Sequence, residues 1–205
     1  RPEESDRVQA ARTLFDTGRW AAAWDTLPPN MADERRVLRV LIRTGGNYGQ
    51  AYASVPKRLK KFLLSAYQSA LFNRVLQARM PDLDRVCTGD LAMKYPGRSV
   101  FRVTDKAAEQ PRALRFEISP TGPVYGYKMM QPLEYPGELE AKVLADEGLT
   151  LEDFRVGDGI KLRGQRRALR FQMHDAELWY DDGIMFRFWL PRGCYATTLL
   201  AEIMK

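Results

Sequence analysis

The most constraining feature of this sequence is a long helical pattern of apolar residues in its first half. Ser54 can cap such a helix, Pro56 fits its first turn, and Pro81 ends it. In between, apolar side chains recur at steps of three and four residues, which places them on one helix face. These positions are Leu59, Phe62, Leu63, Ala66, Tyr67, Ala70, Leu71 and Val75. The pattern predicts a single long helix with one buried face.

Shorter helical patterns precede the long one. Helical spacing predicts three helices, over residues 8–15, 20–27 and 32–43. They are separated by Thr17-Gly18, Pro28-Pro29 and Gly45-Gly46, all of which are typical helix breakers. The Gly45–Gly49 run could also form a flexible binding loop, although a helix stop is the simpler interpretation. The first third of the chain is therefore predicted to be helical.

From about residue 82 the pattern changes to short strands and turns. Apolar runs predict strands over residues 100–103, 113–118, 168–173 and 184–190, with 124–130 as a further candidate. Residues 120–123 (Pro-Thr-Gly-Pro) predict a turn or loop, and Asp181-Asp182-Gly183 predicts a turn before the last strand. Helices are predicted over 136–144 and 193–204, with a short capped turn at 150–153. The fold class is α+β.

Composition excludes several classes of protein. Hydrophobic residues make up 45% of the 205 residues, which is enough for a core and argues against disorder. Apolar runs are too short to span a bilayer. Two cysteines, Cys87 and Cys194, cannot build a disulfide framework, and with one histidine they cannot complete a four-ligand zinc site. No signal peptide is recognisable at the N-terminus, so we expect a reduced, cytoplasmic protein without a metal.

Familiar catalytic motifs are not found in the sequence. It lacks the glycine-rich phosphate-binding motifs and the HExxH zinc motif. His174 lies in a strand-like run, where a packing role is the simpler interpretation. The pair Asp181-Asp182 could serve as an acid and base, but two acids before a glycine are typical of a turn.

Two clusters of basic residues are the best candidates for binding. Lys and Arg number 32 against 26 Asp and Glu, a net charge of +6 that suits a nucleic-acid partner. The first cluster is Lys57, Arg58, Lys60 and Lys61, which opposes the dipole at the start of the long helix. The second is Lys161, Arg163, Arg166, Arg167 and Arg170. Alternatively, the first cluster is a solvated cationic face and the second pairs with Glu138 or Glu140.

Two longer runs resemble one known family. Residues 65–76 (SAYQSALFNRVL) and 188–200 (FWLPRGCYATTLL) match the runs "SAxQSxLFNxxL" and "LPxGxYATxxLxE" of the tRNA pseudouridine synthase D family, TruD. Residues 109–112 (EQPR) and 118–123 (ISPTGP) also look like bacterial members. The resemblance extends from about residue 10 to the end of the chain.

The family's catalytic motifs are not found in this sequence. The family's catalytic aspartate lies in a "GxKDxxAxTxQ" motif that is followed by "NYFGxQRFG", and neither occurs here. Residues 47–50 (Asn-Tyr-Gly-Gln) resemble the second motif only superficially, because the continuation QRFG is missing. We therefore expect the chain to begin just after the second motif and to correspond to the C-terminal part of a TruD-type enzyme.

The resemblance implies three regions. Residues 1–54 would be a helical segment of the catalytic domain, 55–169 an α/β insertion domain special to the family, and 170–205 the closing strands and helix of the catalytic domain. The residues implied to support the uridine pocket are Leu190, Pro191, Arg192, Gly193 and Tyr195. Without the rest of that domain, Phe186, Phe188 and Trp189 should be left poorly covered.

The implied reaction is isomerisation of uridine to pseudouridine at position 13, in the D arm of tRNA, with no cofactor and no metal. We expect the residues present to bind and position tRNA, with the N-terminal half of the same protein as a further partner. Two other hypotheses stay open at this point. One is a free-standing RNA-binding module without chemistry, and the other is a helical interaction protein without RNA affinity.

Overall fold

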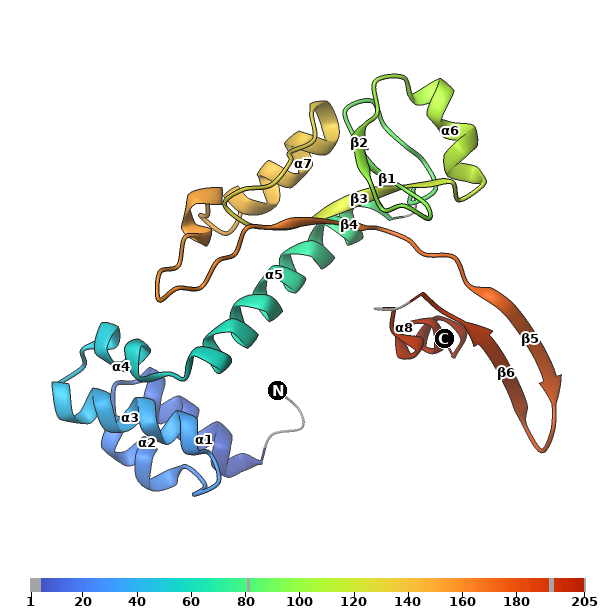
Figure 1. Cartoon of the computed structure of the whole chain (residues 1–205). Helices are drawn as coiled ribbons and strands as arrows, with labels where there is room; N and C mark the ends of the chain where they lie inside the picture. Colours follow the sequence, from blue (N-terminus) through green and yellow to red (C-terminus); the bar gives the residue numbers. More distant parts are fainter. Residues whose placement is uncertain (1–4, 81, 192–193, 205) are drawn as a thin grey trace. The chain divides into compact units, whose positions relative to one another are not determined.

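A computed structural model describes residues 5–80, 82–191 and 194–204 (Figure 1). The chain forms two compact units, residues 1–66 and 67–205. The division falls inside the long helix α5 (Lys57–Arg79). The three regions implied by the family resemblance, with boundaries at residues 54/55 and 169/170, therefore stay predictions.

The first unit is a group of short helices, as the sequence predicts. It contains α1 (Asp6–Asp16), α2 (Trp20–Thr26), α3 (Ala32–Thr44), α4 (Tyr48–Ser54) and the start of α5. Its core contains the buried side chains of Ala11, Ala23, Leu27 and Leu38. The Arg35 guanidinium lies over the Trp24 ring, 3.9 Å from its centroid, and donates to the Trp24 carbonyl. Trp24 thus packs against this core.

Helix α4 is absent from the prediction, which placed a loop or helix stop at residues 45–49. Gly45 does end α3, with a left-handed φ of 62°. A new helix then begins immediately, because the Asn47 side chain accepts a hydrogen bond from the Gln50 backbone N–H (3.0 Å). Ser54 is the last residue of α4 and its hydroxyl donates to the Ala51 carbonyl. The prediction that Ser54 caps the long helix is therefore wrong.

The long helix forms, but only its second half is buried as predicted. In the second unit, Leu71 and Val75 of α5 lie in a core with Tyr125, Leu144 and Phe154. In the first unit, Phe62 and Leu63 of the same helix are 67% and 54% exposed. The first half of α5 thus presents an apolar face that the described residues leave open to solvent. The predicted end at Pro81 lies outside the described residues.

The second unit is built on a four-stranded antiparallel sheet (Figure 1). Its strands are β1 (Leu91–Lys94), β2 (Val100–Arg102), β3 (Ile118–Val124) and β4 (Gln165–Ala168), in the order β2-β1-β3-β4. The connections carry α6 (Lys106–Leu114), α7 (Glu134–Ala145) and the 3₁₀ helix η1 (Leu151–Phe154). The capping pattern predicted at residues 150–153 is confirmed, since Thr150 and Asp153 bond reciprocally.

Three predictions in this region are wrong, and one of them is the candidate strand at 124–130, because β3 ends at Val124. Residues 113–118 are not a strand, because Asp105 caps α6 through the N–H groups of Ala107 and Ala108 and the helix continues to Leu114. Residues 120–123 are not a turn, because they lie within β3, a central strand. The two prolines of β3 lack an N–H, but their carbonyls still serve the sheet, as where Leu169 donates to Pro120.

The C-terminal residues form a hairpin and a helix. Strand β5 (His174–Tyr180) pairs with β6 (Ile184–Trp189) across the predicted turn at 181–183, and α8 (Ala196–Ile203) follows. A strand over 168–173 is wrong, because β4 ends at Ala168 and β5 begins at His174. Among the described residues, β5 and β6 pair only with each other.

The hairpin carries apolar side chains that the described chain leaves uncovered. Phe186 and Trp189 are 39% and 55% exposed, and Phe188 is half-buried. Leu178 stands opposite Phe186, and Tyr180 stands opposite Ile184, so one face of the ribbon is apolar along its length. The sequence-based expectation of poorly covered apolar surface in this segment is confirmed.

Candidate nucleic-acid interface

The first basic cluster opens α5 and contributes three exposed cations. Lys57, Arg58 and Lys61 are exposed. Lys60 points the other way: it is only 5% exposed and its ammonium lies 4.4 Å from the centroid of the Tyr52 ring. Because Tyr52 belongs to α4, Lys60 ties the two helices together. A phosphate could therefore reach Lys57, Arg58 and Lys61 but not Lys60.

The second basic cluster divides into a structural part and an exposed part. Arg166 on β4 belongs to the structural part, because its side chain is 4% exposed. Its two terminal nitrogens donate to both carboxylate oxygens of Glu140 on α7, at 2.8 and 2.7 Å. It also donates to the carbonyl and hydroxyl oxygens of Thr121 on β3. The alternative interpretation from sequence, a pair with Glu140, is confirmed, and the structure leaves Arg166 no donor face for RNA.

Arg170 is also occupied within the protein. Its guanidinium lies 4.2 Å from the centroid of the Phe116 ring and donates to the Ala113 and Ile118 carbonyls. Phe116 itself has a left-handed φ of 57° and lies in the connection between α6 and β3. Arg170 thus fixes that connection, and the prediction that it contacts RNA is not supported by its surroundings.

The exposed part gains two residues that the sequence did not single out. Lys161, Arg163 and Arg167 are exposed, with Arg167 placed 5.2 Å from the Phe72 ring centroid. Lys128 joins them, because its backbone N–H donates to the Arg163 carbonyl (3.0 Å). Arg155 also lies here, with its guanidinium 4.3 Å from the ring centroid of Tyr127. We call Lys128, Arg155, Lys161 and Arg163 the Lys128 cluster.

Glycine backbone holds the segments of the Lys128 cluster together. Residues 126–128 and 162–164 run side by side, with Tyr127 donating to the Leu162 carbonyl (3.0 Å). The approach is so close that a Cβ on Gly126 would lie 2.1 Å from the Gly164 nitrogen. Because Lys128 is 33 residues from Lys161, only the fold could reveal that these cations are neighbours.

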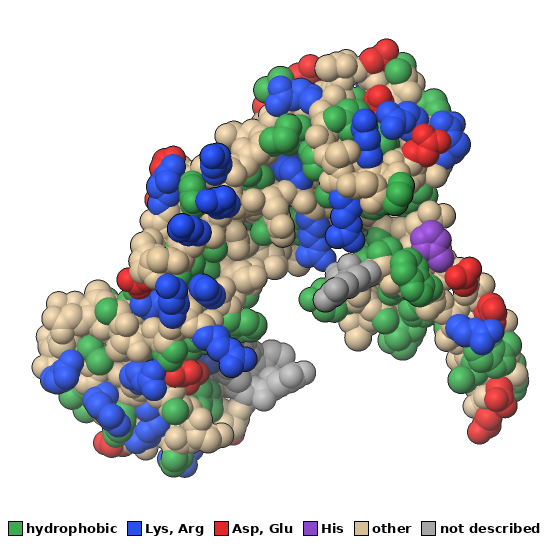
Figure 2. Space-filling model, in the orientation of Figure 1, with side chains coloured by type: hydrophobic (Ala, Val, Ile, Leu, Met, Phe, Trp, Pro, Cys, Tyr) green, Lys and Arg blue, Asp and Glu red, His purple; other side chains and the backbone are tan. Residues whose placement is uncertain are grey.

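The positive charge is concentrated in the first unit. Residues 1–66 hold 12 Lys and Arg against 7 Asp and Glu, a net charge of +5 out of the chain total of +6. Figure 2 shows Lys and Arg side chains outnumbering acidic ones over the helical part of the chain. Such a distribution favours a polyanionic partner for this unit.

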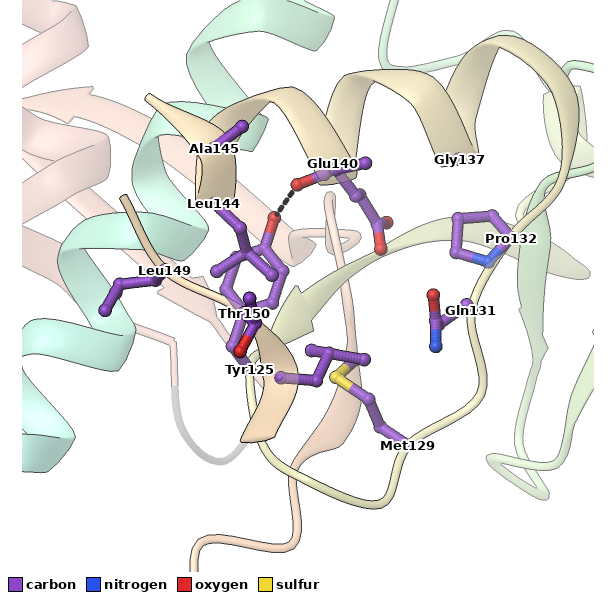
Figure 3. Close-up of a pocket in the computed structure, with 12 residues that line it drawn as sticks. Tyr125, Met129, Gln131, Pro132, Gly137, Glu140, Leu144, Ala145, Leu149 and Thr150 are labelled. Atoms are coloured by element: carbon purple, nitrogen blue, oxygen red, sulfur yellow. Dashed lines mark hydrogen bonds between the residues drawn. The ribbon is translucent and has the colours of Figure 1, made fainter. Parts of the chain in front are cut away.

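A cavity of about 220 Å³ opens between α7, η1 and the loop that follows β3 (Figure 3). Its walls are mainly apolar, and the Tyr125 hydroxyl beside it donates to the Glu140 carbonyl (2.7 Å). Burial raises the pKa of the Glu140 carboxyl, and the Arg166 guanidinium opposes that rise. The residues that line the cavity include Met129, Gln131, Ala141, Leu144, Leu149 and Leu151.

The C-terminal segment holds the residues predicted to support the uridine pocket. Leu190 and Pro191 are half-buried, whereas Tyr195 directly precedes α8 and is 68% exposed. Arg192 and Gly193 lie outside the described residues. Within the described ranges, no group of His, Cys, Asp and Glu is placed to hold a metal ion, and no helix is long and apolar enough to cross a membrane.

Comparison with known proteins agrees with the family resemblance. The family model "tRNA pseudouridine synthase D (TruD)" matches residues 1–203. The chain belongs to the TruD family. The Geobacter sulfurreducens tRNA pseudouridine synthase D is 43% identical over 203 residues, which cover 98% of this chain and 50% of that protein. The Geotalea daltonii protein of the same name is 41% identical, covering 98% of this chain and 51% of its own length.

The fold matches a solved member of the TruD family. A crystal structure of a Methanosarcina mazei protein named after this family superposes with a TM-score of 0.85 at 26% identity, covering all of this chain and 52% of that one. The predicted α+β class is thereby confirmed. In each comparison, this chain spans about half the length of the TruD protein that it matches.

Proposed function

We propose that this chain binds and positions tRNA as one part of a tRNA pseudouridine synthase, which isomerises uridine at position 13 in the D arm. The observation that carries this proposal is the match of the TruD family model to residues 1–203. The chain spans 50% of its Geobacter sulfurreducens relative, which is named tRNA pseudouridine synthase D. The family resemblance assigns the nucleophilic aspartate to the remaining part.

The proposed chemistry divides between two parts of the enzyme. Isomerisation breaks the bond between the ribose and N1 of the base, turns the base, and rejoins it through C5, while C5 loses its proton and N1 gains one. A base in folded RNA must first leave its stack, which costs a few kcal/mol that protein–RNA contacts have to offset. In this proposal the present chain supplies the contacts, and the aspartate of the other part attacks the ribose or the base.

The exposed cations are the proposed contacts to RNA phosphates. They are Lys57, Arg58 and Lys61 at the start of α5, and Lys161, Arg163 and Arg167 before and within β4. Arg side chains match phosphate geometry with two parallel donors, and each contact releases counterions from the RNA. Three other cations support these contacts only indirectly, because they hold helices and strands of the protein together. They are Arg166, Arg170 and Lys60.

The apolar ribbon of β5 and β6 supports a second part of the proposal. A two-stranded hairpin alone is marginally stable in water, and uncovered aromatic side chains favour an interface. We propose that the rest of the TruD protein covers this ribbon and places Leu190, Pro191 and Tyr195 beside the uridine pocket. Action on tRNA also implies a cytoplasmic location.

Binding of an unmodified tRNA transcript tests the proposal. The logarithm of the association constant should fall linearly with the logarithm of salt concentration, by about 0.7–0.9 per phosphate contact. An isolated D-arm stem-loop should compete better than a stem-loop of the anticodon arm. Absence of tRNA binding, or binding that does not respond to salt, would contradict the proposal and favour a helical interaction protein.

A further inference from the structure

We propose that the cavity between α7, η1 and the β3–α7 loop is a pocket for one unstacked nucleobase of the bound RNA. The inference rests on the proposed function, since it names which part of the RNA this surface holds. The cavity of about 220 Å³ is smaller than the roughly 300–1,000 Å³ of sites for drug-sized ligands, so it suits a single ring system.

The walls of the cavity favour an uncharged, flat group. Leu144, Leu149, Leu151 and Met129 all line it (Figure 3). Thioether and aliphatic groups pack against an aromatic ring at little cost in hydrogen bonds. An apolar lining of this kind is favourable for a base but not for a phosphate.

The charged residue in the wall also excludes an anion. Glu140 lines the cavity, yet both of its carboxylate oxygens accept hydrogen bonds from Arg166. The pair is buried, with side-chain exposures of 4% for Arg166 and 9% for Glu140. A phosphate entering here would meet the carboxylate without a free cation, whereas an uncharged base would not be repelled.

Cationic residues are adjacent in the sequence to residues that line the cavity. In this proposal they contact the phosphates of the nucleotide whose base enters the cavity. Lys128 directly precedes Met129 and is exposed. Arg155 directly follows η1, whose first residue Leu151 lines the cavity, and its guanidinium pairs with Glu152 of η1. Lys128 is bonded through its backbone to Arg163. The rest of the Lys128 cluster thus continues from the cavity edge. Apolar walls with adjacent cations match a base joined to its phosphate.

One polar group at the cavity edge could read the base. The Gln131 side-chain amide lies beside the cavity in Figure 3, and an amide offers a donor and an acceptor to a base edge. The Thr150 hydroxyl, by contrast, already donates to Asp153. We therefore assign base contact to Gln131 and not to Thr150.

The test fills the cavity without removing any hydrogen bond. Ala141 lines the cavity from an exposed position on α7, so Ala141→Phe should occupy it while leaving the fold intact. Ala108→Phe is the matched control, since Ala108 is an exposed helical alanine on α6 that does not line the cavity. Ala141→Phe should weaken binding of a tRNA transcript by about tenfold, whereas Ala108→Phe should leave it unchanged. Thermal unfolding should be alike for both variants.

Methyl NMR reports on the pocket directly. With ¹³C-methyl methionine in the chain, the Met129 methyl signal, assigned through Met129→Leu, should move upfield on addition of tRNA because a base ring lies over it. Ala141→Phe should abolish the tRNA-induced change. If tRNA binds but the Met129 signal does not respond and Ala141→Phe binds normally, the pocket inference is wrong and the proposed function stands. Failure of the wild-type chain to bind tRNA at all would overturn both.

Discussion

Replacing Arg166 with alanine should destabilise the second unit and should not act primarily on RNA binding. The change removes the bidentate partner of Glu140, whose side chain is 9% exposed. Truncating one member of a buried, hydrogen-bonded ion pair typically costs about 3–5 kcal/mol, because the other charge stays buried without compensation. That cost is a large share of the roughly 5–15 kcal/mol by which a domain is stable. Urea unfolding followed by circular dichroism measures it.

The acid partner gives this prediction a pH signature. Burial raises the pKa of Glu140 and Arg166 opposes the rise, so loss of Arg166 should raise that pKa further. A carboxyl whose pKa is raised in the folded state stabilises the fold most at pH values below its unfolded pKa of about 4.3. That stabilisation is lost as the pH rises through the raised pKa of the folded state. The cost of Arg166→Ala should therefore be larger at neutral pH than at about pH 4.5.

Two controls separate the ion pair from general damage to the strand. Arg167→Ala alters the next residue of β4, whose side chain is exposed, and should cost less than about 1 kcal/mol. Arg166→Met combined with Glu140→Leu removes both charges and should recover most of the lost stability. Equal costs for Arg166→Ala and Arg167→Ala, or a cost that does not change with pH, would refute the reasoning.

Three further perturbations test other parts of the structure. Gly126→Ala should destabilise the second unit by at least about 2 kcal/mol in a urea titration, because its Cβ would lie 2.1 Å from the Gly164 nitrogen. Gly97→Ala is the control, since its Cβ would meet nothing within 4 Å and the stability should not change. Lys57→Gln with Lys61→Gln should weaken tRNA binding and reduce the slope of its association constant against salt concentration, both as logarithms, by about 1.4–1.8. Lys106→Gln is the control and should change neither. An unchanged slope in the double variant would show that these lysines do not contact the RNA. Leu178→Ser with Phe186→Ser should reduce binding of a hydrophobic dye to the chain, and undiminished dye binding would show that the apolar surface lies elsewhere.

Much of the helical structure follows from local sequence signals. Breakers such as Gly18 and Gly45 separate helices whose apolar spacing is regular, and α5 follows from periodicity alone. The sheet is less predictable because its centre contains Pro120 and Pro123, which are usually signs of a turn. Their place in β3 depends on pairing with β1 and β4, strands that are far away in sequence.

The candidate site shows the same limit. Sequence identifies clusters of cations but cannot tell that Arg166 points to Glu140 while Arg167, its neighbour on the strand, points to the opposite face beside Phe72. Nor can it bring Lys128 and Arg155 to Arg163, since backbone pairing between distant loops does so. Tertiary contacts therefore decide which arginines are buried in structural roles and which are exposed.

Reconstitution of pseudouridine formation tests the central claim most directly. The chain alone, incubated with unmodified tRNA, should form no pseudouridine, because it lacks the motif that carries the family's aspartate. The chain should form pseudouridine at position 13 once it is mixed with the portion of the Geobacter sulfurreducens relative that it does not span. Changing the motif aspartate of that portion to alanine should abolish the product. Pseudouridine formed by the chain alone, or none formed by the mixture, would contradict the assignment of tRNA positioning to this chain and of catalysis to the other part.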